Sequence, residues 1–130
     1  MSAAENADLY VQIHDVLYSL GVTEKYVGFF HTSYAVYLTV QQPERLLFIT
    51  KWLYPDVARR YSTNWRNVER SIRTVIRVAW ILRPELLSHI AGYTLESKPS
   101  NTQFISALAA YLQHSDDSIA SAAVTQSLIS

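Results

Sequence analysis

The chain has 130 residues, about half of them apolar, and a formal net charge of zero, which is typical of a single compact domain. It contains no cysteine, which excludes disulfides, thiolate metal sites and a cysteine nucleophile. The N-terminal residues lack the basic and apolar regions of a signal peptide, and no apolar run approaches the roughly 18 residues of a membrane span. We therefore expect a cytoplasmic protein with no membrane partner.

Helical spacing of apolar residues predicts an all-α fold, a compact domain of about six to seven helices. The first helix is expected over residues 7–20, and Gly21 follows it as a stop signal. A second helix is expected over 24–41, with Thr23 as its N-cap. A proline then breaks the chain, and a third helix is expected over 44–53.

The next three segments predict a helix-turn-helix, in which a short helix and a longer helix flank a tight turn. The short helix is expected over 55–61, the polar turn over 62–64 and the long helix over 65–82. Ala58 is small where the two helices must approach, and the turn has Ser62 where glycine is often found. The apolar seam between the helices is expected to consist of Val57, Tyr61, Val68 and Ile72.

The C-terminal part predicts two further helices and a tail. One helix begins at Pro84 and stops at Gly92, and a last helix, capped by Thr102 or Asn101, ends near residue 113. We expect residues 1–113 to form the helix-turn-helix domain. Residues 114–130 are small and polar, and they are expected to be either a weak helix or a disordered tail.

Four arginines share one face of the helix expected over 65–82, because the steps between them are four, three and four residues. They are Arg66, Arg70, Arg73 and Arg77. The apolar residues of this helix, among them Val68 and Ile72, share another face, which predicts burial. Planar guanidinium groups in such a row suit phosphates and base edges. The alternative is an ordinary solvated face of an amphipathic helix.

The charge is segregated along the chain although its total is zero. Residues 51–83 contain eight basic and two acidic side chains, which makes this segment +6 and the remainder −6. Local charge governs attraction to a polyanion, because salt screens charges beyond about 8–10 Å. The centre of the chain is therefore suited to bind nucleic acid.

The run ITKWLYPDVARRYSTNWRNVERSIRTVIRVAW resembles the C-terminal effector domain of the sporulation stage-zero response regulators of Firmicutes. The resemblance extends upstream to LGVTEKYVGF and downstream to AGYTLESKPSNTQFISALAAYL, and so covers about residues 9–113. It implies an all-helical transcription regulator without a cofactor, whose helix-turn-helix binds double-stranded DNA, often as a tandem pair of domains. Contact with RNA polymerase is also implied.

The resemblance also assigns roles to individual residues. Glu69, Arg70 and Arg73 lie in the motif VERSIR and inherit base reading. This suits their chemistry, since arginine can bond guanine and glutamate can accept from cytosine. Glu69 also stands four residues before Arg73, so an ion pair within the helix is expected as well. The candidates for phosphate or nearby contacts are Arg59, Arg60, Arg66, Asn67, Thr74, Arg77 and Lys98.

The chain departs from the family pattern at several positions. Asn67 replaces a basic residue and Thr74 replaces a histidine, while Trp65 and Arg66 occupy a helix start that is usually small and polar. No receiver domain is contained in the 130 residues. The chain is thus either an excised fragment or, as Met1 and the tail favour, a stand-alone effector domain.

We do not expect an enzyme or a metal site. The four histidines are far apart in sequence, and there is no glycine loop for phosphate. The competing hypothesis to DNA reading is an interaction protein that modulates the full-length regulator or RNA polymerase. The substitutions Asn67 and Thr74 favour this alternative, whereas retention of Glu69, Arg70 and Arg73 favours DNA.

Overall fold

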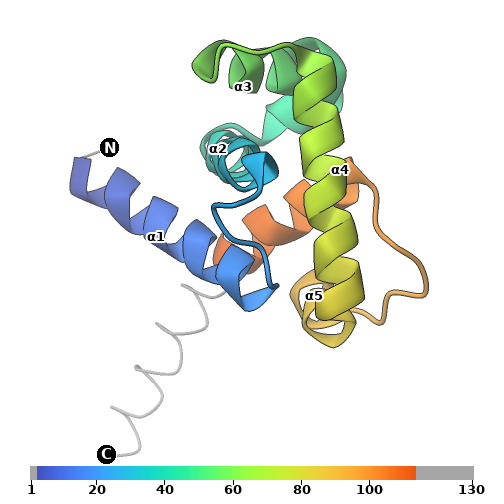
Figure 1. The fold of residues 1–130 in the computed structure, drawn as a ribbon. Helices are drawn as coiled ribbons and strands as arrows, with labels where there is room; N and C mark the ends of the chain where they lie inside the picture. The colour runs from blue at the N-terminus through green and yellow to red at the C-terminus, as the bar shows by residue number, and fades with distance from the viewer. Residues whose placement is uncertain (1–2, 114–130) are drawn as a thin grey trace, which may run out of the picture.

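The structure is a computed structural model that describes residues 3–113 of the chain (Figure 1). Every regular element within this range is a helix, which confirms the expected all-α class. None of these helices combines the length and the hydrophobicity that crossing a bilayer requires. The tail expected over 114–130 lies outside the described residues.

Six α-helices and two irregular helical segments follow one another in the described part of the chain. The elements are α1 (Ala3–Ser19), α2 (Val27–Gln41), the 3₁₀-helix η1 (Pro43–Phe48), the π-helix η2 (Ile49–Leu53), α3 (Tyr54–Arg60), α4 (Trp65–Leu82), α5 (Pro84–Ala91) and a last helix over 101–113. The helix expected over 65–82 is confirmed, with these bounds. The bounds of α3 and α5 lie within a residue or two of their predicted positions.

The prediction of one regular helix over 44–53 is wrong. The chain forms the 3₁₀-helix η1 and then the π-helix η2. At their junction Phe48 has φ −132° and ψ 55°, outside the helical region, so one hydrogen-bonding pattern cannot continue through it. Pro55 then lies in the first turn of α3, where a missing backbone N–H is tolerated.

The expected cap of α2 is also wrong. Tyr26 occupies the N-cap position in an extended conformation and makes no side-chain capping bond. The carbonyl of Thr23 instead accepts a hydrogen bond from the Tyr26 backbone N–H at 3.1 Å. This closes a turn before the helix, so α2 begins three residues later than predicted.

The last helix is capped by Ser100, rather than by Asn101 or Thr102. The backbone N–H of Gln103 donates to Ser100 Oγ at 3.2 Å, and the backbone N–H of Ser100 donates to Gln103 Oε1 at 2.8 Å. This reciprocal pair is a capping box, which satisfies two backbone donors at a helix start. The side chain of Asn101 is thereby left for contacts with other elements.

Helix α2 lies at the centre of the fold and contacts α1, α3 and α4 (Figure 1). The predicted inner face of α4 is buried, and it joins one hydrophobic core with side chains of α1, α2, α5 and the last helix. The buried residues of α4 are Val68, Ile72, Val75, Ile76 and Ala79. The outer face of α4 is consequently fixed toward solvent by the packing of its inner face.

Two polar or close contacts join α2 to α4. A methyl group at Gly28 would overlap the Ser71 carbonyl oxygen and stand 2.6 Å from Val75 Cγ2, so only glycine allows this approach. Beside it, the buried ring of His31 bonds Ser71 Oγ through Nδ1 at 2.6 Å. Since the Ser71 hydroxyl donates to the Val68 carbonyl, its oxygen accepts from His31 Nδ1–H.

The turn between α3 and α4 ends α3 with a Schellman motif. The backbone N–H of Thr63 donates to the Ala58 carbonyl at 3.0 Å, and that of Ser62 donates to the Arg59 carbonyl at 3.5 Å. Ser62 has φ +54°, the left-handed conformation that glycine adopts most easily. Serine therefore occupies the position in the turn at which a helix-turn-helix often has glycine.

Most of the expected seam between α3 and α4 is buried, but Tyr61 is not part of it. Val57, Val68 and Ile72 are fully buried, whereas Tyr61 is 36% exposed. The Tyr61 ring lies 5.2 Å from the His31 ring centroid and 6.2 Å from that of Tyr34. Tyr61 instead packs against aromatic side chains of α2. It is the last residue before Ser62, whose left-handed backbone turns the chain.

Replacing Gly28 by alanine is expected to destabilise the protein by about 2 kcal/mol, even though alanine favours helix, because overpacking costs about 1–3 kcal/mol or more. The Ser71 carbonyl belongs to the α4 backbone and cannot move alone. Urea unfolding followed by circular dichroism measures the change. An unchanged midpoint would contradict the close approach of α2 and α4.

Replacing Ser62 by glycine is expected to raise the free energy of unfolding by up to about 1 kcal/mol, since the left-handed conformation disfavours residues with a Cβ. Thermal unfolding of Ser62→Gly beside Ser62→Ala checks this. Alanine has the same backbone restriction as serine, so it should not stabilise. A lower melting temperature for the glycine variant would contradict the strain.

Stability is expected to fall as the pH drops below about 6.5. Burial lowers the pKa of His31 from 6.5, and burial also lowers that of His14, against the opposing charges of Glu24 and Asp15. Below pH 6.5 the unfolded chain therefore binds more protons than the folded chain, which favours unfolding. Urea unfolding from pH 7.5 to 5.5 measures the slope.

The variant His31→Asn should flatten this pH dependence, because it removes one of the two groups. Equal slopes for this variant and the wild type would contradict the role of His31.

Candidate nucleic-acid interface

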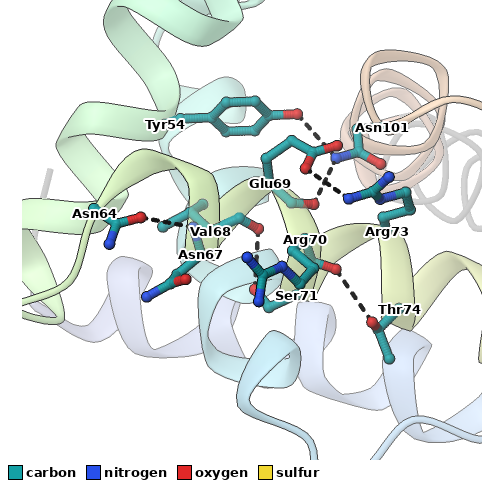
Figure 2. Close-up of polar contacts among 10 residues, drawn as sticks. All are labelled: Tyr54, Asn64, Asn67, Val68, Glu69, Arg70, Ser71, Arg73, Thr74 and Asn101. Carbon is teal, nitrogen blue, oxygen red and sulfur yellow. Dashed lines mark hydrogen bonds and ion pairs between the residues drawn. The ribbon is translucent and has the colours of Figure 1, made fainter.

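Helix α4 presents its arginines from a well-defined start. Asn64 is the N-cap, in an extended conformation, and its Oδ1 accepts a hydrogen bond from the Asn67 backbone N–H at 2.9 Å (Figure 2). The Asn67 side chain donates in turn to Thr63 Oγ1 at 3.0 Å. These bonds join the turn to the first turn of the helix, so the register of the outer face is fixed.

The outer face of α4 forms one side of a depression of about 490 Å³, here called the basic groove. Its lining residues are Arg70, Arg73, Thr74, Arg77 and Lys98. Lys98 comes from the loop that follows α5 and runs back along α4 (Figure 1). Among the side chains of residues 7–113, which the structure describes, no acidic group forms an ion pair with Arg70, Arg77 or Lys98. The structure thus brings together five of the ten predicted site residues.

The expected pair between Glu69 and Arg73 is present. Arg73 Nη2 donates to Glu69 Oε2 at 3.1 Å, and the two side chains are 57% and 32% exposed (Figure 2). An exposed pair of this kind contributes little to stability. Its main effect is to orient the Arg73 guanidinium along the helix beside the basic groove.

Asn101 anchors the first residue of the last helix to α3 and α4. Its Nδ2 donates to Tyr54 Oη at 2.9 Å and to the Glu69 carbonyl oxygen at 3.0 Å (Figure 2). Tyr54 is buried, and burial raises the pKa of its hydroxyl against the opposing hydrogen bond from Asn101. One side chain therefore links three helices next to the Glu69–Arg73 pair.

Two of the candidate contacts already have partners within α4 and its turn. The Asn67 side chain is bonded to Thr63. The Thr74 hydroxyl donates to the Arg70 carbonyl at 3.2 Å (Figure 2). Both side chains are short and uncharged. Either would exchange an existing bond for a new one on binding a ligand, which lowers the net gain.

The remaining arginines lie outside the basic groove. Arg66 is exposed and its guanidinium lies 5.4 Å from the ring centroid of its neighbour Trp65. Arg59 and Arg60 are exposed on α3 and line a separate depression. There Arg59 pairs with Asp56, while Arg60 lies 5.4 Å from the Tyr34 ring centroid. Of the ten predicted residues, five line the basic groove and Glu69 is paired with one of them, Arg59 and Arg60 lie on α3, and Arg66 and Asn67 lie at the start of α4.

Sequence reasoning missed Tyr54 and Asn101 as residues of this region. The signal that was available is the spacing of Ser100 and Gln103, which marks a capping box and so leaves Asn101 as the first residue of the helix. No local pattern predicts the bonds from Asn101 to Tyr54 and Glu69, because these bonds span 47 and 32 residues of sequence.

Among residues 7–113, whose side chains the structure describes, no three histidine, aspartate or glutamate side chains cluster closely enough to hold a metal ion. The charged groups that line the basic groove are guanidinium and ammonium groups. These donate hydrogen bonds and attract anions, but they have no lone pair for a metal.

Comparison with protein families gives one match over most of the chain. The family described as "Sporulation initiation factor Spo0A C terminal" matches residues 13–112. This range contains the turn, all of α4 and the basic groove. The family is a DNA-binding effector domain of a response regulator that controls transcription, and it is not a family of enzymes. The chain therefore belongs to the family of C-terminal domains of the sporulation initiation factor Spo0A.

Proposed function

We propose that this protein is a sequence-specific transcription regulator that binds double-stranded DNA through a helix-turn-helix made by α3, the Ser62–Asn64 turn and α4. The observation that carries the proposal is the basic groove, where Arg70, Arg77 and Lys98 converge without an acidic partner in the described range. In such a unit the second helix lies in the major groove and the first crosses the DNA backbone.

The dimensions of α4 support this arrangement. Its 18 residues extend about 27 Å, long enough to follow a major groove that is about 12 Å wide. Its apolar face is committed to the core, so binding would not require the helix to leave the fold. The capped start at Asn64 holds the residues of the first two turns in a fixed register, as base recognition requires.

Glu69, Arg70 and Arg73 are proposed to read base edges. Arg70 is exposed in the basic groove, and its guanidinium can bond guanine O6 and N7 together. Glu69 can accept from cytosine while it stays paired with Arg73, because a carboxylate accepts several hydrogen bonds. The pair also sets the direction from which Arg73 approaches the bases.

The other candidates are proposed to contact phosphates or to lie near them. Lys98 and Arg77 flank the base-reading residues within the basic groove. Arg66, near the helix start, is exposed and is assigned to the DNA backbone. Further candidates for backbone or nearby contact are Arg59, Arg60, Asn67 and Thr74.

Pairing on DNA as a homodimer or as a tandem pair, and contact with RNA polymerase or the full-length regulator, are proposed as further interactions. The bonds that already engage Asn67 and Thr74 favour one competing function, an interaction protein that does not read DNA. That function predicts no binding to duplex. A chain that binds chromosomal DNA would be associated with the cytoplasmic nucleoid.

The affinity for a short duplex of mixed sequence is expected to fall steeply as salt rises, with log K decreasing by about 0.9 per phosphate contact for each unit of log salt. At a site selected from a random library, Arg73→Ala should lose about 1–3 kcal/mol of binding if it makes a good base contact. Fluorescence anisotropy across a potassium chloride series measures both quantities.

The matched control is Lys25→Ala, which removes one exposed positive charge from the turn before α2, outside the basic groove. This variant should bind almost as the wild type does. The proposed function fails if the wild type binds no duplex at low salt, or if Arg70→Ala and Arg73→Ala both bind as the control does.

A further inference from the structure

We propose that Asn101 is a positioning residue of the basic groove: its side-chain amide joins α3, α4 and the last helix, and so holds Lys98 beside the arginines of α4. The inference rests on the proposed DNA binding and adds a residue that need not touch DNA. The starting observation is geometric, since Asn101 Nδ2 lies 2.9 Å from Tyr54 Oη and 3.0 Å from the Glu69 carbonyl oxygen.

The chemistry of the amide suits this position. An asparagine NH₂ group has two hydrogens, and each is used toward one of the two acceptors. The Tyr54 hydroxyl is on a buried side chain of α3, and the Glu69 carbonyl lies in the base-reading motif on α4. The two hydrogen bonds from Asn101 to Tyr54 and Glu69 are here called the joint. Neither an alanine nor an aspartate can donate in this way, so the joint depends on asparagine.

The joint constrains Lys98 because the loop between them is short and anchored. Pro99 is buried, and Ser100 is fixed by the capping box with Gln103. Closer to α5, the backbone N–H of Leu95 donates to Ser88 Oγ at 2.9 Å. Lys98 itself is exposed. Its backbone is thus held from both sides while its ammonium group stays available.

Without the joint, Lys98 would remain in the sequence but lose its fixed place in the basic groove. An exposed lysine on a loose loop must give up conformational entropy to reach a phosphate, which reduces its contribution to binding. The inference therefore predicts coupling: the effect of removing Lys98 should depend on whether residue 101 is asparagine.

The test is a double-mutant cycle of wild type, Lys98→Ala, Asn101→Ala and the double variant. Each protein is titrated with the same short mixed-sequence duplex across a potassium chloride series. Lys98→Ala should flatten the salt dependence by about 0.9 in the wild-type background and by much less in the Asn101→Ala background. Equal flattening in both backgrounds overturns the proposal.

Thr102→Ala is the matched control, because Thr102 is exposed in the same helical turn; in this background Lys98→Ala should keep its full effect. If Asn101→Ala does not fold, Tyr54→Phe takes its place, since it removes one of the two acceptors. In the Tyr54→Phe background Lys98→Ala should flatten the salt dependence by less than it does in the wild type, and full flattening in that background overturns the proposal.

A measurement without DNA separates this proposal from the proposed function. Hydrogen exchange should be faster in residues 93–100 of Asn101→Ala than of Thr102→Ala. If the wild type binds no duplex but this difference is found, the proposed function fails while the joint stands. If exchange in this loop is unchanged, the joint itself is refuted.

Discussion

The close packing of α2 against α4 is the constraint on which the rest of the structure depends. Gly28 lets the backbone of Ser71 approach the N-terminal part of α2, and His31 bonds the Ser71 side chain. Ser71 lies between Arg70 and Arg73 in the chain. The side of α4 that meets α2 and the side that bears the arginines therefore have one common backbone, and an error in packing would rotate the charged face.

The bonds at the two ends of the turn favour side chains, rather than backbone N–H groups, for the proposed contacts with DNA. The start of a helix offers free backbone N–H groups to anions. At α4 Asn64 already accepts from the backbone of Asn67, and the Schellman motif before it uses the N–H groups of Ser62 and Thr63. The full positive charges at the basic groove are those of the guanidinium and ammonium groups.

Sequence patterns predicted α4 well and its surroundings less well, for a physical reason. In α4 the apolar residues, among them Val68 and Ile72, and the arginines recur at helical spacing. This local pattern predicts which face is buried, because burial follows helical periodicity. The irregular path through η1 and η2 depends on how α2 and α3 pack, and composition alone favoured one helix. Likewise the convergence of Lys98 with Arg70 is a long-range contact, which no spacing rule contains.

A neutral chain can bind a polyanion only if its charges are separated in space. The fold separates them further than the net charge of +6 on residues 51–83 suggests. It brings Lys98 from outside that segment to the arginines of α4, and it pairs Arg59 with Asp56 away from them. Glu69 is the one acidic residue of α4. A carboxylate near DNA is repelled by phosphates, so on the proposed function Glu69 would contribute selectivity rather than affinity. On the proposed function, Arg73 offsets that repulsion while Glu69 discriminates among bases.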